Sequence, residues 1–346
     1  MNKITILEND QEKRVISPNY NYLFKKDSGF FARWGTSADD DPQWSPAGPE
    51  IADIEISSIC HQGCSWCYKS NTEVGENMSF NTFKDIFHKL PRTLTQIAFG
   101  IGSIDANPDL WKIMQYCRDN DYNRVVPNIT INGYRITDDD IRQLVKLCGA
   151  VAVSNYSRNA CYGTVERLAN AGLEQVNIHQ VLCEETYDKC FQLLYEKRSD
   201  GRLANLNAIV FLILKPKGMR NTFTQLKDPN KYKKLIDYAL DKRVAIGFDS
   251  CSANSFLKAI EGHAQEKSLT QCAEPCESTC FSVYVDCSGA FYPCSFSVGE
   301  PGIKPLYLEN GNIFLRDIWH SEQFKQFRDK LHGCGRKCPL FDVEIQ

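Results

Sequence analysis

The chain has 346 residues, of which 42% are hydrophobic and 11% aromatic, so it can form one large or two smaller globular domains. Its 40 basic and 43 acidic residues nearly cancel, which argues against a nucleic-acid-binding protein or one that binds anionic membranes. The sequence has no apolar run typical of a signal peptide or long enough to span a bilayer. We therefore expect a cytoplasmic protein with no membrane or nucleic-acid partner. In that compartment its sixteen cysteines would be metal ligands or buried apolar residues rather than disulfides.

Residues 1–50 are expected to form an N-terminal extension that contains a β-hairpin. Two aromatic-rich runs, Tyr20–Phe24 and Phe30–Trp34, flank a turn with the sequence Asp-Ser-Gly. The segment Asp39–Pro49, rich in Asp, Pro and Gly, follows as a linker.

Residues 51–250 alternate short apolar runs with amphipathic stretches. The predicted strands are Asp53–Ser57, Gln96–Gly100, Asn128–Ile131, Ala150–Ser154, Gln175–His179, Asn207–Leu214 and Ala245–Asp249. The helices predicted between them include Thr82–Leu90, Leu110–Asn120, Thr137–Cys148, Tyr162–Ala171 and Tyr187–Arg198. This alternation implies right-handed βαβ units, a parallel sheet and the α/β fold class. Six or seven units are too few for a closed eight-stranded barrel, so we predict a partial (β/α)6 TIM-like barrel with its site at the carboxyl ends of the strands.

Residues 251–346 have a different composition and carry eight of the sixteen cysteines. Helical periodicity returns only over Leu315–Leu331. We expect a small C-terminal α+β domain that depends on metal.

Three cysteines follow the first predicted strand of the barrel with the spacing C-x3-C-x2-C. Cys60, Cys64 and Cys67 lie within eight residues of a loop that contains glycine, so their thiolates can converge on one metal centre. Three thiolates are one fewer than a cubane iron–sulfur cluster usually has, which leaves one iron open for a substrate or cofactor. The alternative is a zinc site, which would need a fourth Cys or His nearby.

This cysteine motif resembles that of the radical S-adenosylmethionine (SAM) superfamily, in which an aromatic residue typically precedes the third cysteine, as Trp66 does here. The resemblance implies a [4Fe–4S] cluster whose unique iron is chelated by SAM. It also implies reductive cleavage of SAM to a 5′-deoxyadenosyl radical, and an electron donor such as flavodoxin or ferredoxin.

The resemblance extends to residues at later strand ends, which would contact SAM. Gly100 and Gly102 stand where the family has a Gly-Gly-Glu-Pro stretch, but the Glu is missing and Ser103 or Asp105 would replace it. The other positions that match or could contribute are Thr130, Asn132, Ser154, Arg158 and His179. Arg158 could pair with the SAM carboxylate as a bidentate fork. His179 could equally be an interior histidine without a contact to SAM or substrate.

A second group of cysteines surrounds a predicted hairpin at Ser288-Gly289 and ends in a C-x3-C pair. This part of the chain resembles the SPASM/twitch extension of radical SAM enzymes, in its shorter form with one auxiliary [4Fe–4S] cluster. The resemblance assigns the ligands Cys276, Cys294, Cys334 and Cys338. Cys272, Cys280 and Cys287 are alternatives, and zinc is the alternative metal.

Two residues at the end of the last barrel strand are the candidates for substrate chemistry. Asp249 could act as a base, and Cys251 could be an auxiliary ligand, a hydrogen-atom donor or a core residue. Modification of a ribosomally made peptide by oxidation, cross-linking or epimerisation is our first expectation. The alternatives are a radical SAM dehydrogenase or mutase of a small molecule and, outside enzymology, a zinc- or iron–sulfur-binding protein.

Overall fold

The computed structural model describes residues 4–37 and 40–345. Within these residues the larger sheet has the strand order β11-β10-β9-β8-β7-β6-β5-β12-β13, and β5 to β11 run parallel to their neighbours. The barrel strands are β5 (Ile51–Ser57), β6 (Gln96–Ile101), β7 (Val126–Ile131), β8 (Val151–Ser154), β9 (Val176–Leu182), β10 (Ala208–Ile213) and β11 (Ile246–Phe248). The α/β class and the open parallel sheet predicted from the sequence are confirmed.

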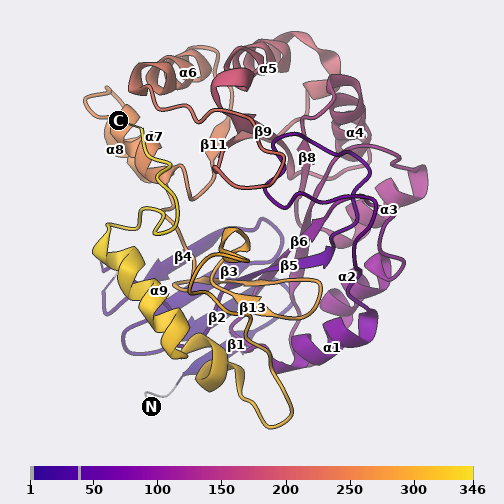
Figure 1. The fold of residues 1–346 in the computed structure, drawn as a ribbon, viewed down its shortest axis with the longest axis vertical. Helices are drawn as coiled ribbons and strands as arrows, with labels where there is room; N and C mark the ends of the chain where they lie inside the picture. Colours follow the sequence, from indigo (N-terminus) through magenta and orange to yellow (C-terminus); the bar gives the residue numbers. More distant parts are fainter. Residues whose placement is uncertain (1–3, 38–39, 346) are drawn as a thin grey trace.

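Helices follow the barrel strands in turn and cover the outer face of the curved sheet (Figure 1). They are α1 (Phe80–Lys89), α2 (Leu110–Asp119), α3 (Asp138–Leu147), α4 (Arg158–Asn170), α5 (Tyr187–Ser199) and α6 (Pro229–Asp241), with the short 3-10 helices η1 (Glu184–Thr186) and η2 (Gly201–Leu203). Each predicted barrel helix is present, and α6 adds one that the sequence analysis did not name.

Side chains of β5 alternate between the helix-covered core and the barrel interior. Ile54 and Ile56 are at most 1% exposed and pack in the main core. Asp53, Glu55 and Ser57 have the opposite orientation and line an interior cavity. Polar residues therefore occupy the inner face of a strand that is buried on its outer face.

The N-terminal extension forms a separate antiparallel sheet with the order β1-β2-β3-β4. Its strands are β1 (Thr5–Glu8), β2 (Glu12–Ile16), β3 (Asn21–Lys25) and β4 (Phe31–Trp34). The predicted hairpin corresponds to β3 and β4, whereas β1 and β2 were missed because their charged residues hide the alternation. The predicted linker is free of helix and strand over its described residues 40–49, and Asp39 lies outside them.

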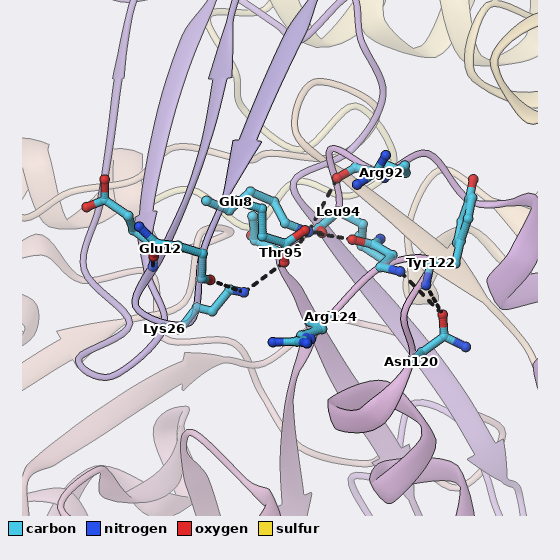
Figure 2. A network of polar contacts seen from close by, with 12 residues as sticks. Glu8, Glu12, Lys26, Arg92, Leu94, Thr95, Asn120, Tyr122 and Arg124 are labelled. Carbon is cyan, nitrogen blue, oxygen red and sulfur yellow. Dashed lines mark hydrogen bonds and ion pairs between the residues drawn. The ribbon is translucent and has the colours of Figure 1, made fainter.

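A polar network joins this sheet to the amino-terminal side of the barrel strands. Lys13 is fully buried, and its Nζ donates to the carbonyl of Leu94 at 2.9 Å and contacts Asn123. Figure 2 shows the surrounding contacts, including the ion pair between Lys26 and Glu8 at 2.7 Å. These contacts hold the extension at the end of the barrel opposite to the cysteine loops.

The C-terminal part joins the barrel sheet directly. Its strand β12 (Ser282–Val285) pairs in parallel with β5, and β13 (Phe291–Tyr292) pairs antiparallel with β12. The remaining elements after the barrel are α7 (Ala253–Ala259), α8 (Glu266–Thr270), η3 (Ser295–Ser297), the π-helix η4 (Leu315–Trp319) and α9 (Glu322–Gly333). The helix predicted over Leu315–Leu331 is thus divided, because Ser321 caps the start of α9 by accepting from the amide of Phe324. Within residues 4–37 and 40–345, no helix is both long and apolar enough to cross a membrane.

Arg33 of β4 ties the N-terminal sheet to the other two parts of the molecule. Its Nε lies 2.8 and 2.9 Å from the two carboxylate oxygens of Glu50, and its guanidinium group contacts Glu277 and lies 4.0 Å above the ring of Phe281. The side chains of Arg33 and Glu50 are 8% and 3% exposed, so removing one partner leaves the other as a buried charge without a counter-ion.

We predict that Arg33→Ala lowers the free energy of unfolding by about 3 kcal/mol, because it leaves Glu50 buried without its cation. Glu274→Ala is the matched control, since it removes a more exposed partner of the same arginine and should cost less than about 1 kcal/mol. Urea unfolding of both variants measures the difference. Equal losses would contradict the role of the buried pair.

Candidate active site

A cavity of about 580 Å³ lies inside the barrel at the carboxyl ends of its strands. The loop after β5 contributes Cys60, Cys64 and Cys67 to its wall. The structure also places there most of the residues proposed to contact SAM or substrate: Trp66, Gly100, Gly102, Thr130, Asn132, Ser154, His179 and Asp249. The topology thus brings together residues that are far apart in the sequence; Cys60 and Asp249, for example, are separated by 189 positions.

Backbone hydrogen bonds within the cysteine loop fix its shape, and the start of the loop lies against the end of β6. The amide of Cys60 donates to the carbonyl of Thr72 at 2.7 Å, and that of Cys67 donates to the carbonyl of Cys64 at 3.2 Å. A Cβ atom at Gly102 would overlap the carbonyl oxygen of Ile59 and lie 2.6 Å from the Cβ of Cys60. Glycine is therefore required at position 102 for the loop to approach the strand end.

The three loop thiols are close enough to influence one another. Burial, together with the charges of Cys60 and Cys67, raises the pKa of Cys64 to about 11. Metal binding to these thiols must therefore release their protons. Over residues 4–37 and 40–345, no group of three or more His, Cys, Asp or Glu side chains is arranged to hold a single metal ion.

Trp66 forms an aromatic wall beside the thiols. Its ring centroid lies 4.9 Å from that of Phe223 and 5.6 Å from that of Tyr156. The indole nitrogen is buried and has no hydrogen-bond partner in the described part of the chain. A buried N–H without a partner is costly, so this donor is available to a molecule bound in the cavity.

Side chains at the next strand ends are oriented by internal hydrogen bonds. Asn132 donates to the carbonyl of Gly102 at 2.8 Å and accepts from the amide of Tyr134 at 3.0 Å. Burial lowers the pKa of His179 to about 4, although the charge of Asp249 opposes this, so the imidazole is neutral at pH 7.

Two residues proposed from the sequence as SAM contacts do not line the cavity. Ser103 is buried and accepts from the backbone amide of His61 at 3.2 Å, so it supports the cysteine loop instead. Arg158 begins α4 and pairs with Glu196 at 3.0 Å and Asp200 at 3.1 Å. The fork proposed for Arg158 is therefore engaged outside the barrel, which corrects the prediction.

Two ion pairs in the cavity wall were not anticipated. Lys69, just after the cysteines, lies 3.1 Å from the carboxylate of Glu55, which also accepts from the hydroxyl of Tyr284 at 2.9 Å. Lys215 pairs with Asp249 and lies 4.6 Å from the ring centroid of Phe296. Lys215 follows β10, and its side chain is only 3% exposed.

Asp53 lies on the inner face of β5, and none of the described residues gives its carboxylate a hydrogen bond or an ion pair. Burial, together with the charge of Glu277, raises the pKa of Asp53 to about 7. The polar alternation of Asp53 and Glu55 within an otherwise apolar strand could have identified both residues from the sequence.

The second group of cysteines gathers beside the barrel end of β11. Burial raises the pKa of Cys251 to about 12; Lys215 opposes the increase, and the charges of Asp249, Cys294 and Cys338 contribute to it. Burial also raises the pKa of Cys276, and the charges of Cys251, Cys294 and Cys338 act in the same direction. These four thiols therefore form one interacting group.

Cys334 is not among the thiols that act most strongly on the pKa of Cys251, Cys276 or Cys294. Its Sγ contacts the carbonyls of Leu331 at 3.3 Å and Lys337 at 3.2 Å. Of the alternatives, Cys272 is exposed and Cys280 is buried. The Sγ of Cys280 lies 3.4 Å from Nε2 of His332. Cys287 adjoins Glu55 and Ser58. The structure thus favours Cys251 over Cys334 as the fourth thiol of the group.

Comparisons with known proteins agree with this arrangement. Residues 276–339 match the SPASM family, described as an iron-sulfur cluster-binding domain. The fold resembles that of Streptococcus suis SuiB bound to S-adenosylmethionine, with a TM-score of 0.63 and 12% identity over 82% of this chain and 68% of that chain. It also resembles native anSMEcpe with bound AdoMet and Cp18Cys peptide, with a TM-score of 0.59 and 17% identity over 85% of this chain and 88% of that chain. No curated protein sequence matches the chain.

The C-terminal segment is therefore a SPASM iron–sulfur cluster-binding domain. The fold of the chain is similar to that of these two proteins, both of which were solved with S-adenosylmethionine. The SPASM resemblance predicted from the sequence is confirmed by the matched segment, and the predicted iron–sulfur clusters and SAM agree with these findings.

The raised pKa of Asp53 predicts a dependence of stability on pH. The folded protein binds a proton more tightly than the unfolded chain, whose Asp53 titrates near 3.8, so stability should fall as the pH rises from about 4 to about 7. The other titratable groups that line the cavity with Asp53 are unchanged when wild type is compared with an Asp53 variant. They include Glu55, Lys69, Tyr68 and Tyr284.

Asp53→Asn should remove this contribution, so that the variant melts at a higher temperature than wild type at pH 8, and the difference should be clearly smaller at pH 5. Anaerobic thermal melts at both pH values test this. A variant less stable than wild type at pH 8 would contradict an unpaired carboxylate.

Proposed function

We propose that the chain is a radical SAM enzyme whose first [4Fe–4S] cluster is held by Cys60, Cys64 and Cys67. The observation that carries the proposal is the position of these thiols on a cavity formed by the carboxyl ends of the barrel strands, beside an iron–sulfur domain. Three thiols leave one site of a cubane open, which is where SAM would be held. When bound, the cluster would supply the electron that cleaves SAM and so provide a radical for abstraction of a substrate hydrogen.

The chain's own residues would orient SAM and keep water from it. The glycines at the end of β6 expose backbone groups, and Asn132 fixes the carbonyl of Gly102. Thr130 and Ser154 present hydroxyl groups to the same cavity, and the indole of Trp66 offers its unpaired N–H. Tyr68 and Phe296, with ring centroids 4.3 Å apart, would close the side that faces the SPASM domain.

The auxiliary cluster would be held by Cys251, Cys276, Cys294 and Cys338. Cys251 follows β11 and packs against the main core together with Cys338, which places thiols from the barrel and the SPASM domain side by side. Lys215 would balance part of the negative charge of these thiolates.

The substrate is proposed to be a ribosomally made peptide. This rests on the fold shared with anSMEcpe, which was solved with a bound peptide. Asp249 lies on the cavity wall near both groups of cysteines, where its carboxylate would accept a proton released from the substrate. Its pairing with Lys215 and Ser252 would hold the carboxylate in place. A small electron-transfer protein such as flavodoxin or ferredoxin would serve as the donor in the cytoplasm.

Replacing Cys60, Cys64 and Cys67 together with Ala should abolish formation of 5′-deoxyadenosine from SAM, with a loss of at least about 100-fold, because no thiolate remains for the first cluster. The reaction is followed anaerobically in reduced protein by liquid chromatography. The triple variant should keep about four irons in the second site. Undiminished SAM cleavage would refute the proposal.

The two candidates for the fourth auxiliary thiol can be separated by a matched pair of variants. Wild type should hold about eight irons, four per cluster, and Cys334→Ala should hold the same number. Cys251→Ala should lose auxiliary iron or change the electron paramagnetic resonance signal of that cluster. The opposite pattern would restore Cys334 as the ligand, and zinc in place of iron would overturn the cluster itself.

A further inference from the structure

The charged side chains in the cavity wall are unevenly paired. Glu55 has Lys69 and Tyr284 as partners. Asp249 has Lys215. Asp53 remains the one wall carboxylate without a cation or a donor in the part of the chain that the structure describes. The wall therefore carries one carboxyl group without a compensating partner among the described residues.

Both lysines among the described residues of the cavity wall are already paired with other carboxylates, Lys69 with Glu55 and Lys215 with Asp249. On one side the register partner of Asp53 is Ala98 of β6, and on the other it is Tyr284 of β12, whose hydroxyl donates to Glu55. The nearby charge that acts on Asp53 is that of Glu277, which is also negative. An anionic group of a bound molecule would be repelled here, and a neutral apolar group would leave the carboxylate without a partner.

We propose that Asp53 receives a primary ammonium group of the substrate at the inner end of the cavity. The inference rests on the proposed function, because that function makes this cavity the substrate site. An ammonium group supplies both the missing charge and the missing donors, and a charge-assisted hydrogen bond in a water-poor cavity is stronger than a neutral one.

The same chemistry could come from a lysine side chain of a peptide or from a free amine. Three probes separate these sources: Nα-acetyl-lysinamide, its uncharged analogue Nα-acetyl-norleucinamide, and n-pentylamine. Their dissociation constants are measured by ligand-observed NMR on the reconstituted protein with SAM and without reductant, so that no turnover occurs.

The wild type should bind the lysine probe at least about tenfold more tightly than the norleucine probe. Asp53→Asn should reduce this preference to within about twofold, and Asp53→Glu, which retains the charge, should keep most of it. Asp139→Asn on α3 removes a mostly exposed carboxylate and is the matched control. Tighter binding of the lysine probe than of n-pentylamine would identify a peptide source, and the reverse a free amine.

The absence of a preference in wild type, or its persistence in Asp53→Asn, would overturn the inference. So would a loss of SAM affinity in Asp53→Asn without any lysine preference, since it would assign the carboxylate to SAM. Failure of the reduced wild type to cleave SAM would instead overturn the proposed function, while the binding preference is still measured in its own right.

Discussion

The parallel pairing of β12 with β5 is the contact on which the rest of the structure depends. The first strand of an open barrel is an exposed edge, and an unpaired edge invites association with other chains. Here the edge is covered by a strand from the SPASM domain, with Tyr284 opposite Asp53 in register. The same pairing brings the hydroxyl of Tyr284 to Glu55, and Cys294 comes directly after β13, which pairs with β12. One backbone ladder thus determines where the second group of thiols lies.

The charged groups follow from this arrangement. A parallel strand buried on both faces is usually apolar, but β5 carries carboxylates on its inner face because that face borders a cavity. Lys69 and Lys215 come from loops at the same end of the barrel and each neutralise one carboxylate. Both lysines also lie against aromatic rings, at 4.6 Å from the centroids of Tyr284 and Phe296. The cavity is therefore ordered by buried electrostatic contacts rather than by apolar packing alone.

Much of the barrel could be predicted from the sequence because apolar period and turn residues are local properties. The cysteine loop was equally accessible, since its spacing is contained in eight residues. The direction of a side chain could not be predicted in the same way. Arg158 lies at the start of a helix and its side chain pairs with Glu196, and the side chain of Ser103 points toward the backbone of the cysteine loop. The choice between Cys251 and Cys334 depends on which distant segments meet, which only the tertiary path determines.

The central claim is that one cavity serves SAM and lies between two iron–sulfur clusters. Diffraction at the iron absorption edge from anaerobic crystals of the reconstituted protein with SAM tests it most directly. We expect two iron peaks, one at Cys60, Cys64 and Cys67 with SAM beside it in the cavity, and one among Cys251, Cys276, Cys294 and Cys338. A zinc edge at either position, or SAM bound outside the cavity, would contradict the account.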